Sequence, residues 1–445
     1  MRALSAAARV LERRLDPNSR APVVAAFSGG GDSLALLLAA RAFAERRGRP
    51  LVAIHVDHGL QPQSGVWAAD AEAVARRLGA HFVLRRWTGP KPATGLPAAA
   101  RAARHRLIAE ACRELGATVA LIGHTFDDQL ENALMRGAGA PVGALREWSP
   151  SPVWPEGRDL FLCRPLLSAR RTDLRSWLAA EGLAWLDDPA NDDWRYARAR
   201  ARRALADGAA AEPCPDPDLR SLAGLCRATP WGGVVIERAG LLTAKPEPAL
   251  RLLQIAVACV SGAEGLARPG RARGLMSRLA GGETFVAGLG GARIEAGALE
   301  VALEREAGEA ARGGLQPVLV APGRPEVWDG RFEAQVLHET VRIEALRGQL
   351  SRLGTKDRAE VVKVSVSARP VLPVFRTVDQ KVAEARLVLT GSGAHIEDQN
   401  VRCRALCEAR LAAAIGLVSS EADIGTIARM ANFSTPHYVG AGSKD

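Results

Sequence analysis

The sequence predicts an α/β protein with a doubly wound parallel sheet, followed by a small helical domain and a mixed α+β C-terminal region. Three observations lead to this prediction. Apolar strands alternate with helical segments from residue 21 to about 140. Glycine-rich or polar residues follow these strands, at the edge where such a sheet binds its ligands. Segments with a period of two, separated by glycine-marked turns, begin at about residue 281.

The expected elements of the N-terminal sheet follow one another closely. Short apolar runs mark four strands, at 23–27, 51–56, 81–87 and 118–123. Helical periodicity marks the segments between and after them, at 34–43, 65–79, 97–115 and up to about 135. A further amphipathic helix is expected at about 170–181. This alternation favours a parallel sheet over an antiparallel one.

The loop after the first strand, SGGGDS at Ser28–Ser33, predicts a site for an anion. Backbone N–H groups can approach an oxyanion closely at three successive glycines, Gly29, Gly30 and Gly31. The start of the following helix adds partial positive charge at the same place. The hydroxyls of Ser28 and Ser33 can donate hydrogen bonds to phosphate oxygens.

Two common nucleotide-binding signatures are absent from this loop. A P-loop requires a lysine that this segment lacks, and the dinucleotide fingerprint requires glycine where Leu34 stands. The loop instead contains a carboxylate, Asp32. A carboxylate beside a pyrophosphate is explained if Mg²⁺ bridges the two groups. We therefore expect Asp32 to bind Mg²⁺.

A second polar constellation, GHTFDDQLEN at 123–132, begins where the fourth strand ends and continues into a helix. Asp127 and Asp128 stand at the helix N-terminus, where the helix dipole stabilises carboxylates. Asp128, Glu131 and Asn132 share one face of that helix. Two carboxylates beside an anhydride can bind Mg²⁺ or a substrate ammonium. The alternative is an ordinary N-cap with a solvated polar face.

The second strand ends in the polar sequence HVDHGL, which contains His55, Asp57 and His58. A metal site is conceivable there, but neighbouring strand residues point to opposite faces and no further ligand is near in sequence. We favour a polar strand end that lines a nucleotide pocket.

Arginine is concentrated in two segments. Arg101 and Arg104 share a face of the helix at 97–115, and on spacing alone they form a solvated basic stripe. In the segment WRYARARARRALA, which starts at Trp194, arginines alternate with aromatic residues. This pattern suits RNA, because guanidinium groups pair with phosphates and unstacked bases stack on aromatic rings. A surface helix with a basic face explains it almost as well.

The composition is that of a soluble globular protein with 445 residues, of which 47% are hydrophobic and 24% charged. The net charge of +10 suits a polyanionic partner. No apolar segment is long enough to cross a membrane, and the amphipathic N-terminus lacks a signal core. The seven cysteines form no Cys-x-x-Cys pair, which argues against a zinc ribbon, an iron–sulfur cluster or a disulfide framework. We expect a cytoplasmic protein without membrane contact.

The motifs resemble those of one enzyme family. Ser28–Ser33 resembles the SGGxDS loop of the ATP-pyrophosphatase (PP-loop) superfamily. The stretches GHTFDDQLEN, MRGAG, RPLL and DDPANDDWRYARARAR resemble, in this order, the HxxDDQxET, RGSG, RPLL and EDPSNxD…RNxxR motifs of the tRNA(Ile)-lysidine synthetases. The resemblance covers about residues 20–205. Four positions depart from the pattern without removing a carboxylate or an arginine: Asn132, Ala138, Ala190 and Ala199.

This resemblance implies an enzyme that uses ATP and Mg²⁺ to adenylate the C2 carbonyl oxygen of the wobble cytidine of tRNA(Ile) with a CAU anticodon. The ε-amine of L-lysine then attacks C2 and expels AMP, which leaves lysidine. Two alternatives stay open: a PP-loop enzyme that thiolates tRNA, and a nucleotide-gated RNA-binding protein without catalysis. The missing Cys-x-x-Cys pair counts against the first alternative.

The resemblance also implies roles for individual residues. ATP binding falls to Ser28, Gly29, Gly30, Gly31, Asp32, Ser33, Asp57, His58, Gly123 and His124. Catalysis falls to Asp32, which also binds Mg²⁺, and to Asp128, Arg101, Arg104 and Arg202. Lysine would contact Asp128 and Glu131. The tRNA would contact Arg136, Arg195, Arg198, Arg200 and Arg202.

We expect three domains. Residues 1–205 form the catalytic PP-loop domain, 206–280 a linker with a small helical domain that binds substrate or tRNA, and 281–445 an α+β region with a tRNA-binding role. Beyond about residue 376 the pattern turns helical, and the last residues, from 431, are expected to be a disordered tail. The sequence leaves the oligomeric state open, a homodimer included.

Overall fold

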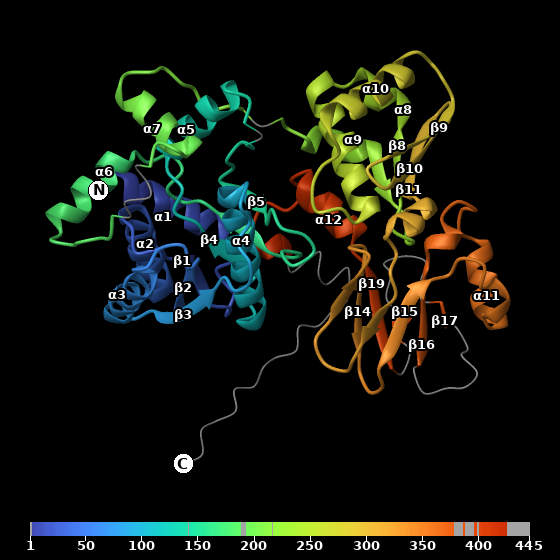
Figure 1. Ribbon diagram of the computed structural model, residues 1–445, viewed down its shortest axis with the longest axis horizontal. Coiled ribbons are helices and arrows are strands. Elements are labelled where there is room, and N and C mark those ends of the chain that lie inside the picture. The colour runs from blue at the N-terminus through green and yellow to red at the C-terminus, as the bar shows by residue number, and fades with distance from the viewer. Residues whose placement is uncertain are drawn as a thin grey trace. The chain divides into compact units, whose positions relative to one another are not determined.

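The computed structural model describes residues 2–140, 142–187, 193–215, 217–377, 386–387, 396–397 and 400–424 (Figure 1). These residues form two compact units. The first contains the described residues of Met1–Asp216 together with Ser419–Ile424, and the second those of Pro217–Val418. In this part of the chain, every helix is too short or too polar to span a membrane. The expected disordered tail from residue 431 lies outside the described residues.

The sheet of the first unit has six strands in the order β3-β2-β1-β4-β6-β5. The strands are β1 (Val23–Ala26), β2 (Leu51–Asp57), β3 (His81–Arg86), β4 (Val119–Leu121), β5 (Trp148–Pro150) and β6 (Phe161–Cys163). All neighbours pair in parallel except β5, which runs antiparallel to β6. The expected α/β class and the four expected strands are confirmed. The two strands beyond β4 are additions, because three-residue strands leave little periodicity in the sequence.

In the described residues before 216, seven helices accompany this sheet. They are α1 (Arg2–Arg14), α2 (Gly31–Arg47), α3 (Ser64–Arg77), α4 (Leu96–Glu114), α5 (Phe126–Gly137), α6 (Arg171–Ala180) and α7 (Ala197–Ala206). The chain moves from β1 to β2 to β3 and then returns to β4, so right-handed crossovers put α2 and α3 on one face and α4 on the other. The buried side of α4, including Ile108 and Cys112, packs on apolar residues of β1, β2 and β4.

The order in which the chain forms the strands changes side between β1 and β4. From β1 the chain continues through β2 to β3 at one edge, and it then forms β4 on the other side of β1. In an open α/β sheet, ligands bind at such a reversal, outside the carboxyl ends of the strands. The loops that follow these two strands approach closely there, because a Cβ atom on Gly123 would lie 3.2 Å from the backbone oxygen of Asp32. Glycine at position 123 therefore lets the two conspicuous motifs of the sequence meet.

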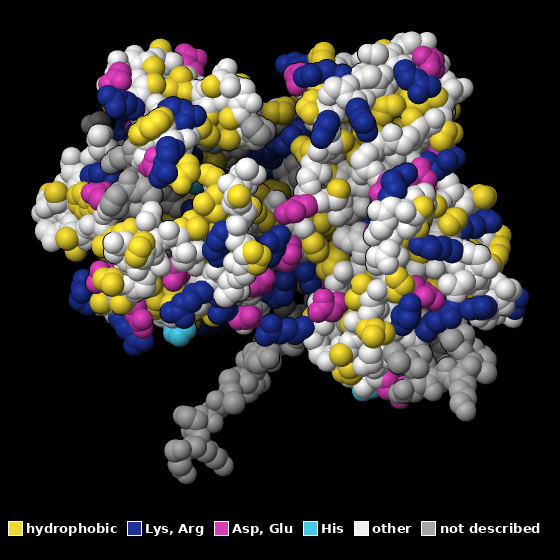
Figure 2. Space-filling model, in the orientation of Figure 1, with side chains coloured by type: hydrophobic (Ala, Val, Ile, Leu, Met, Phe, Trp, Pro, Cys, Tyr) yellow, Lys and Arg dark blue, Asp and Glu magenta, His cyan; other side chains and the backbone are white. Residues whose placement is uncertain are grey.

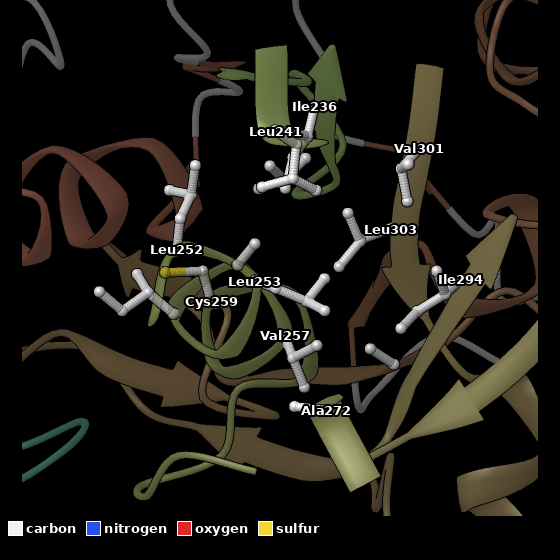
Figure 3. Packing of buried hydrophobic residues seen from close by; sticks show 14 of the residues in the cluster. Ile236, Leu241, Leu252, Leu253, Val257, Cys259, Ala272, Ile294, Val301 and Leu303 are labelled. Atoms are coloured by element: carbon white, nitrogen blue, oxygen red, sulfur yellow. The ribbon is translucent and has the colours of Figure 1, made fainter. Parts of the chain in front are cut away.

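The second unit begins with a five-stranded antiparallel sheet in the order β7-β8-β11-β10-β9. Its strands are β7 (Cys226–Ala228), β8 (Val234–Glu237), β9 (Phe285–Leu289), β10 (Ala292–Ala296) and β11 (Glu300–Arg305). The helices of this region are α8 (Arg238–Thr243), α9 (Pro246–Ser261), α10 (Pro269–Ala280) and, later in the chain, α12 (Cys407–Ala414). Helix α9 is apolar on nearly all sides, which buries it at the centre. Figure 3 shows its side chains meeting those of β8, β10 and β11.

Two four-stranded antiparallel sheets follow, in the orders β12-β15-β16-β17 and β13-β14-β19-β18. The strands are β12 (Val318–Val320), β13 (Glu326–Trp328), β14 (Phe332–Val336), β15 (Val341–Ala345), β16 (Pro373–Thr377), β17 (Arg386–Leu387), β18 (Ile396–Glu397) and β19 (Val401–Ala405). One apolar core, with Trp328 and Phe332, joins both sheets, and α11 (Thr355–Val362) lies between β15 and β16 in sequence. The expected helical pattern after about residue 376 is wrong for β17, β18 and β19, and right for α12.

The two units are a coarser division than the three domains expected at 1–205, 206–280 and 281–445. The structure has no break between residues 280 and 281, because β8 pairs with β11 across that position, from Glu237 opposite Glu300 to Val234 opposite Leu303. The helices at 238–280 therefore belong to a body that also contains a sheet.

The first unit is discontinuous in sequence, since Ser419–Ile424 is part of it. Glu421 accepts two hydrogen bonds from the guanidinium of Arg49, both of 2.9 Å. It also accepts from the backbone N–H of Asp16 at 2.9 Å and from the hydroxyl of Ser19 at 3.1 Å. The side chains of Arg49 and Glu421 are only 2% and 5% exposed, so this ion pair is shielded from water.

Removing Glu421 should destabilise the first unit strongly. Breaking a buried ion pair by deleting one partner leaves an uncompensated charge and costs about 3–5 kcal/mol. We expect Glu421→Ala to lower the free energy of unfolding by about 3 kcal/mol or more in urea titrations. The control is Glu45→Ala, which removes an exposed pair with Arg41 on α2 and should cost about 0.5 kcal/mol or less. Equal losses in the two variants would contradict the prediction.

Candidate active site

The loop between β1 and α2 keeps its shape through its own two serines. Ser33 Oγ donates to the carbonyl of Gly30 at 2.8 Å and accepts from the backbone N–H of Ser28 at 3.2 Å. The two hydroxyl oxygens lie 3.1 Å apart. Gly29 has a φ of +89°, a conformation that favours glycine. The serines thus shape the loop, and both also line the cavity above it.

Trp185 and Leu186 lie against this loop, a contact that the sequence alone does not predict. The backbone N–H of Leu186 donates to the carbonyl of Gly29 at 3.0 Å. A Cβ atom on Gly29 would lie 2.7 Å from the side chain of Leu186, and one on Gly31 would lie 3.4 Å from the ring of Trp185. The glycines therefore serve a second purpose, which is to let this apolar segment approach.

Three carboxylates and one guanidinium meet beside the loop. Nε of Arg171 donates to Asp32 at 3.0 Å, and its Nη1 donates to Glu131 at 2.9 Å. Its Nη2 lies 3.4 Å from Oδ1 of Asp128. Burial lowers the pKa of Arg171, but these three carboxylates outweigh it and raise the pKa above its ordinary value. Arg171 was not among the residues expected from the sequence, although it follows the RPLL motif closely.

Glu131 is the most engaged of the three acids. Its side chain is 0% exposed, and it also lies 3.1 Å from Nε of Arg198 and 3.0 Å from Nε of Arg202. Three guanidinium groups, two of them from α7, thus surround one carboxylate. Asp128 and Glu131 lie on one face of α5, as the spacing predicts. Their carboxylates contact arginine side chains rather than solvent.

Asp128 divides its two oxygens between two tasks. Oδ2 closes a capping box, because it accepts from the backbone N–H of Thr125 at 2.7 Å and from its hydroxyl at 2.9 Å. Oδ1 has longer contacts, 3.4 Å to Arg171 and 3.7 Å to Arg198. The N-cap alternative is therefore correct for one oxygen, while the other has only these longer contacts to arginines.

Asp32 has one oxygen that fits a cation. Its Oδ2 accepts from Arg171, whereas its Oδ1 is buried and has no hydrogen-bond partner among the described residues. Burial raises the pKa of Asp32, and Arg171 opposes this shift. A buried carboxylate oxygen without a partner is a costly arrangement that a bound Mg²⁺ would relieve.

The two arginines of α4 lie close to this group. Nε of Arg104 is buried without a hydrogen-bond partner among the described residues, and the side chain lines the cavity. Burial, together with the neighbouring charge of Arg101, lowers the pKa of Arg104 to about 9, so that it stays charged at neutral pH. Burial likewise lowers the pKa of Arg101, which does not reach the cavity wall. The solvated-stripe interpretation of these arginines is thus wrong for Arg104.

His124 is held in one tautomer by a neighbour. Nε of Arg164 donates to Nδ1 of His124 at 3.0 Å, and Arg164 also donates to the carbonyl of Arg146 at 2.8 Å. Since arginine can only donate, Nδ1 accepts and the ring proton resides on Nε2. Burial and the charge of Arg164 hold the pKa of His124 well below its ordinary value. Arg164, the first residue of the RPLL motif, therefore orients a neutral histidine that lines the cavity.

The cavity between these groups has a volume of ≈ 310 Å³. The expected residues on its wall are Ser28, Gly30, Gly31, Asp32, Ser33, His58, Arg104, Gly123, His124, Asp128, Arg198 and Arg202. The expected residues away from its wall are Gly29, Asp57, Arg101, Glu131, Arg136, Arg195 and Arg200. Wall residues that sequence reasoning missed include Arg171, Arg175, Leu186 and Asp187. Residues 188–192, within the stretch DDPANDDWRYARARAR, lie outside the described residues.

Residues near the end of β2 divide between the cavity and the fold. Asp57 accepts from the backbone N–H of Gly59 at 2.8 Å, which shapes the turn after the strand. His55 bonds the carbonyl of Phe27 at 2.9 Å. His58 faces the cavity, and burial lowers its pKa to about 4. Of these three residues, only His58 lines the cavity, as expected for a polar strand end beside the pocket.

The arginines expected at tRNA face different surroundings. Arg195 is 74% exposed on its side chain and pairs with Asp193 beside it. Arg200 donates to the carbonyl of Trp194 at 3.0 Å, and Trp194 itself is 74% exposed. Arg136 donates to the carbonyl of Val142 at 3.2 Å. Arg195 and Trp194 are thus available to an external partner.

Comparison with known proteins supplies a family and relatives for this site. A family model described as a PP-loop domain matches residues 4–208. The chain is 46% identical over 411 residues to the tRNA(Ile)-lysidine synthase of Caulobacter vibrioides, covering 92% of this chain and 97% of that protein. It is 37% identical over 401 residues to the tRNA(Ile)-lysidine synthase of Mesorhizobium japonicum, covering 82% and 85%.

Among solved structures, the chain resembles the U34-tRNA thiolase of Methanococcus maripaludis, with 17% sequence identity and a TM-score of 0.37. The match covers 46% of this chain and 72% of that one. A TM-score this low carries no argument about function.

Acid should destabilise the first unit, partly through His105. This residue of α4 is 2% exposed, its two ring nitrogens have no partner among the described residues, and burial lowers its pKa to about 2. The unfolded chain binds a proton at this residue below about pH 6.5 and the folded one does not, so folding stability falls as the pH falls from about 6.5 toward 2.

We expect His105→Gln to reduce the slope of unfolding free energy against pH by about 1.4 kcal/mol per pH unit between about pH 4 and 6. Urea titrations at several pH values measure this slope. The unaltered protein, titrated in parallel, is the reference. An unchanged slope in His105→Gln would show that the residue is protonated in the folded state.

Proposed function

Because this chain belongs to the tRNA(Ile)-lysidine synthase family, we propose that it joins L-lysine to C2 of the wobble cytidine of tRNA(Ile) with a CAU anticodon, using ATP and Mg²⁺. The observation that carries this proposal is one cavity, whose wall includes the glycine loop, Asp32, Asp128 and several arginines. The buried Oδ1 of Asp32 has no hydrogen-bond partner among the described residues. Such a cavity can hold a nucleotide phosphate and a cationic substrate side by side. The place of action would be the cytoplasm, where tRNA is modified.

In the first step, the C2 carbonyl oxygen of the cytidine attacks the α-phosphate of ATP, and pyrophosphate leaves. Backbone N–H groups of Ser28–Ser33 and the start of α2 would hold the phosphates. Arg104, whose side chain lines the same cavity, would offset the charge that develops on them. Bound Mg²⁺ would neutralise part of the pyrophosphate charge, and Oδ1 of Asp32 would hold it.

In the second step, the C2–N bond to the lysine ε-amine forms and the C2–O bond to AMP breaks. Only the free amine is a nucleophile, so the ammonium has to lose a proton first. Asp128 lines the cavity, and its Oδ1, which has only the longer contacts to Arg171 and Arg198, would accept a hydrogen bond from the ammonium and then take up this proton. Glu131, on the same face of α5, would contribute a second carboxylate to that binding.

The wobble cytidine has to leave the anticodon stack to enter the cavity, and a single-stranded loop permits this at low cost. Exposed Trp194 and Arg195 could then contact a base and a phosphate of the RNA. On the face seen in Figure 2, Lys and Arg side chains are spread over both units. This distribution agrees with the net charge of +10 and with a large polyanionic partner.

The thiolation alternative is not favoured by the cavity. Thiol transfer needs a reactive cysteine, and the described residues on the cavity wall include none. Five of the seven cysteines are buried, and Cys214 is the exposed one.

The direct test is incubation of the protein with tRNA(Ile) bearing CAU, radiolabelled lysine, ATP and Mg²⁺. We expect acid-precipitable label that depends on ATP and falls at least about a hundredfold in Asp32→Ala and Asp128→Ala, since each removes a charge that stabilises the reacting groups. Arg76→Ala, which removes an exposed pair with Glu72 on α3, is the control and should keep full activity. If pyrophosphate is released but the tRNA is not labelled, a nucleophile other than lysine would have to be sought. If neither signal appears and tRNA still binds, the protein would be an RNA-binding protein without this activity.

The glycine loop can be tested separately from the chemistry. We expect Gly29→Ala to weaken ATP binding at least about tenfold in calorimetric titrations, because the new methyl group collides with Leu186 and its φ is unfavourable. The control is Gly48→Ala, just after the C-terminal end of α2. Gly48 also has a positive φ, of 60°, but no atom lies within 4 Å of the new Cβ. It should lose some stability and keep its ATP affinity. Equal affinities in the two variants would remove the loop from the ATP site.

A further inference from the structure

Arg171 connects the two motifs that form the cavity. It is the first residue of α6, and its backbone N–H donates to Oδ2 of Asp127 at 2.7 Å, which fixes the start of that helix. From there its guanidinium contacts Asp32 in the glycine loop and both Asp128 and Glu131 on α5. Among the described residues, only Arg171 forms ion pairs with both Asp32 and the acids of α5. It also lines the cavity.

The acids around this guanidinium are already paired with cations of the protein. Three carboxylates stand against three guanidinium groups, which belong to Arg171, Arg198 and Arg202. The acids that would receive a substrate ammonium are therefore occupied by cations of the protein itself. An incoming ammonium would meet Arg171 at Asp128, and two like charges in one partly desolvated place repel each other.

Arg171 has an alternative partner once a nucleotide is present. Its side chain shares the cavity wall with Ser28, Gly30 and Gly31, which belong to the loop suited to phosphate. A guanidinium group pairs with phosphate oxygens as well as it does with carboxylates. Nucleotide phosphate therefore competes with the acids of α5 for Arg171.

We propose that Arg171 is an internal cation that occupies the lysine site until nucleotide phosphate draws its guanidinium away. ATP and lysine then bind cooperatively, since the first ligand removes the competitor of the second. Arg171 is thus a positioning residue that sets the order of substrate binding. This inference rests on the proposed function, because it takes Asp128 and Glu131 as the site of the lysine ammonium.

Arg198 and Arg202 are less suited to this role. Both come from α7 and meet the acids of α5, and Arg198 also donates to the amide oxygen of Asn132 at 3.1 Å. Neither forms an ion pair with Asp32 in the described structure, so a change at the glycine loop would not reach them through that acid.

Calorimetric titration of the full-length protein with L-lysine tests the proposal, with and without a non-hydrolysable ATP analogue and Mg²⁺. In the unaltered protein, the analogue should tighten lysine binding at least about tenfold. In Arg171→Ala, lysine should bind at least about tenfold more tightly than to the unaltered protein without nucleotide, and the analogue should add little. Arg170→Ala is the matched control. Arg170 is the half-exposed neighbour of Arg171, pairs with Asp127 and does not line the cavity.

Arg171→Lys keeps the charge but cannot reach all three carboxylates at once, so its lysine affinity without nucleotide should lie between those of the other two proteins. This variant carries the test if Arg171→Ala does not fold. Lysine binding in Arg171→Ala that is no tighter than in the unaltered protein would overturn the inference alone. Lysine binding that is unaffected by Asp128→Asn, or absent from every variant with nucleotide present, would overturn the proposed function as well.

Discussion

The candidate site depends on one fully buried carboxylate, that of Glu131. A charge without access to water is tolerated only when opposite charges surround it, and here the guanidinium groups of α6 and α7 do so. Arg171 and Arg202 stand 40 and 71 residues further along the chain. The buried acid therefore fixes where these later segments lie against α5, and with them much of the cavity wall.

The sequence is sufficient to predict the centre of the site. Strand and helix periodicity locate β1 and β4, and the reversal of strand order brings Ser28–Ser33 and Asp128 to one edge. The shared face of Asp128 and Glu131 follows from helical spacing alone. These features are local in sequence, or they follow from general rules of sheet topology, and so they need no knowledge of side-chain packing.

Contacts between distant segments are a different matter. Nothing in the sequence around Arg171 distinguishes it from Arg170 next to it, yet one lines the cavity and the other pairs with Asp127. The same holds for Leu186, whose neighbour Gly29 is far away in sequence. In the second unit, β8 pairs with β11, and three helices separate these two strands in sequence. A local sequence pattern cannot predict such a pairing.

The ion pair between Arg49 and Glu421 has a consequence for how the protein is made. Ser419–Ile424 leaves the ribosome after residues 217–418 of the second unit, although it belongs to the first. Until then Arg49 sits in the nascent first unit without the acid that neutralises it. The first unit can thus be completed only after residues 217–418 have been synthesised.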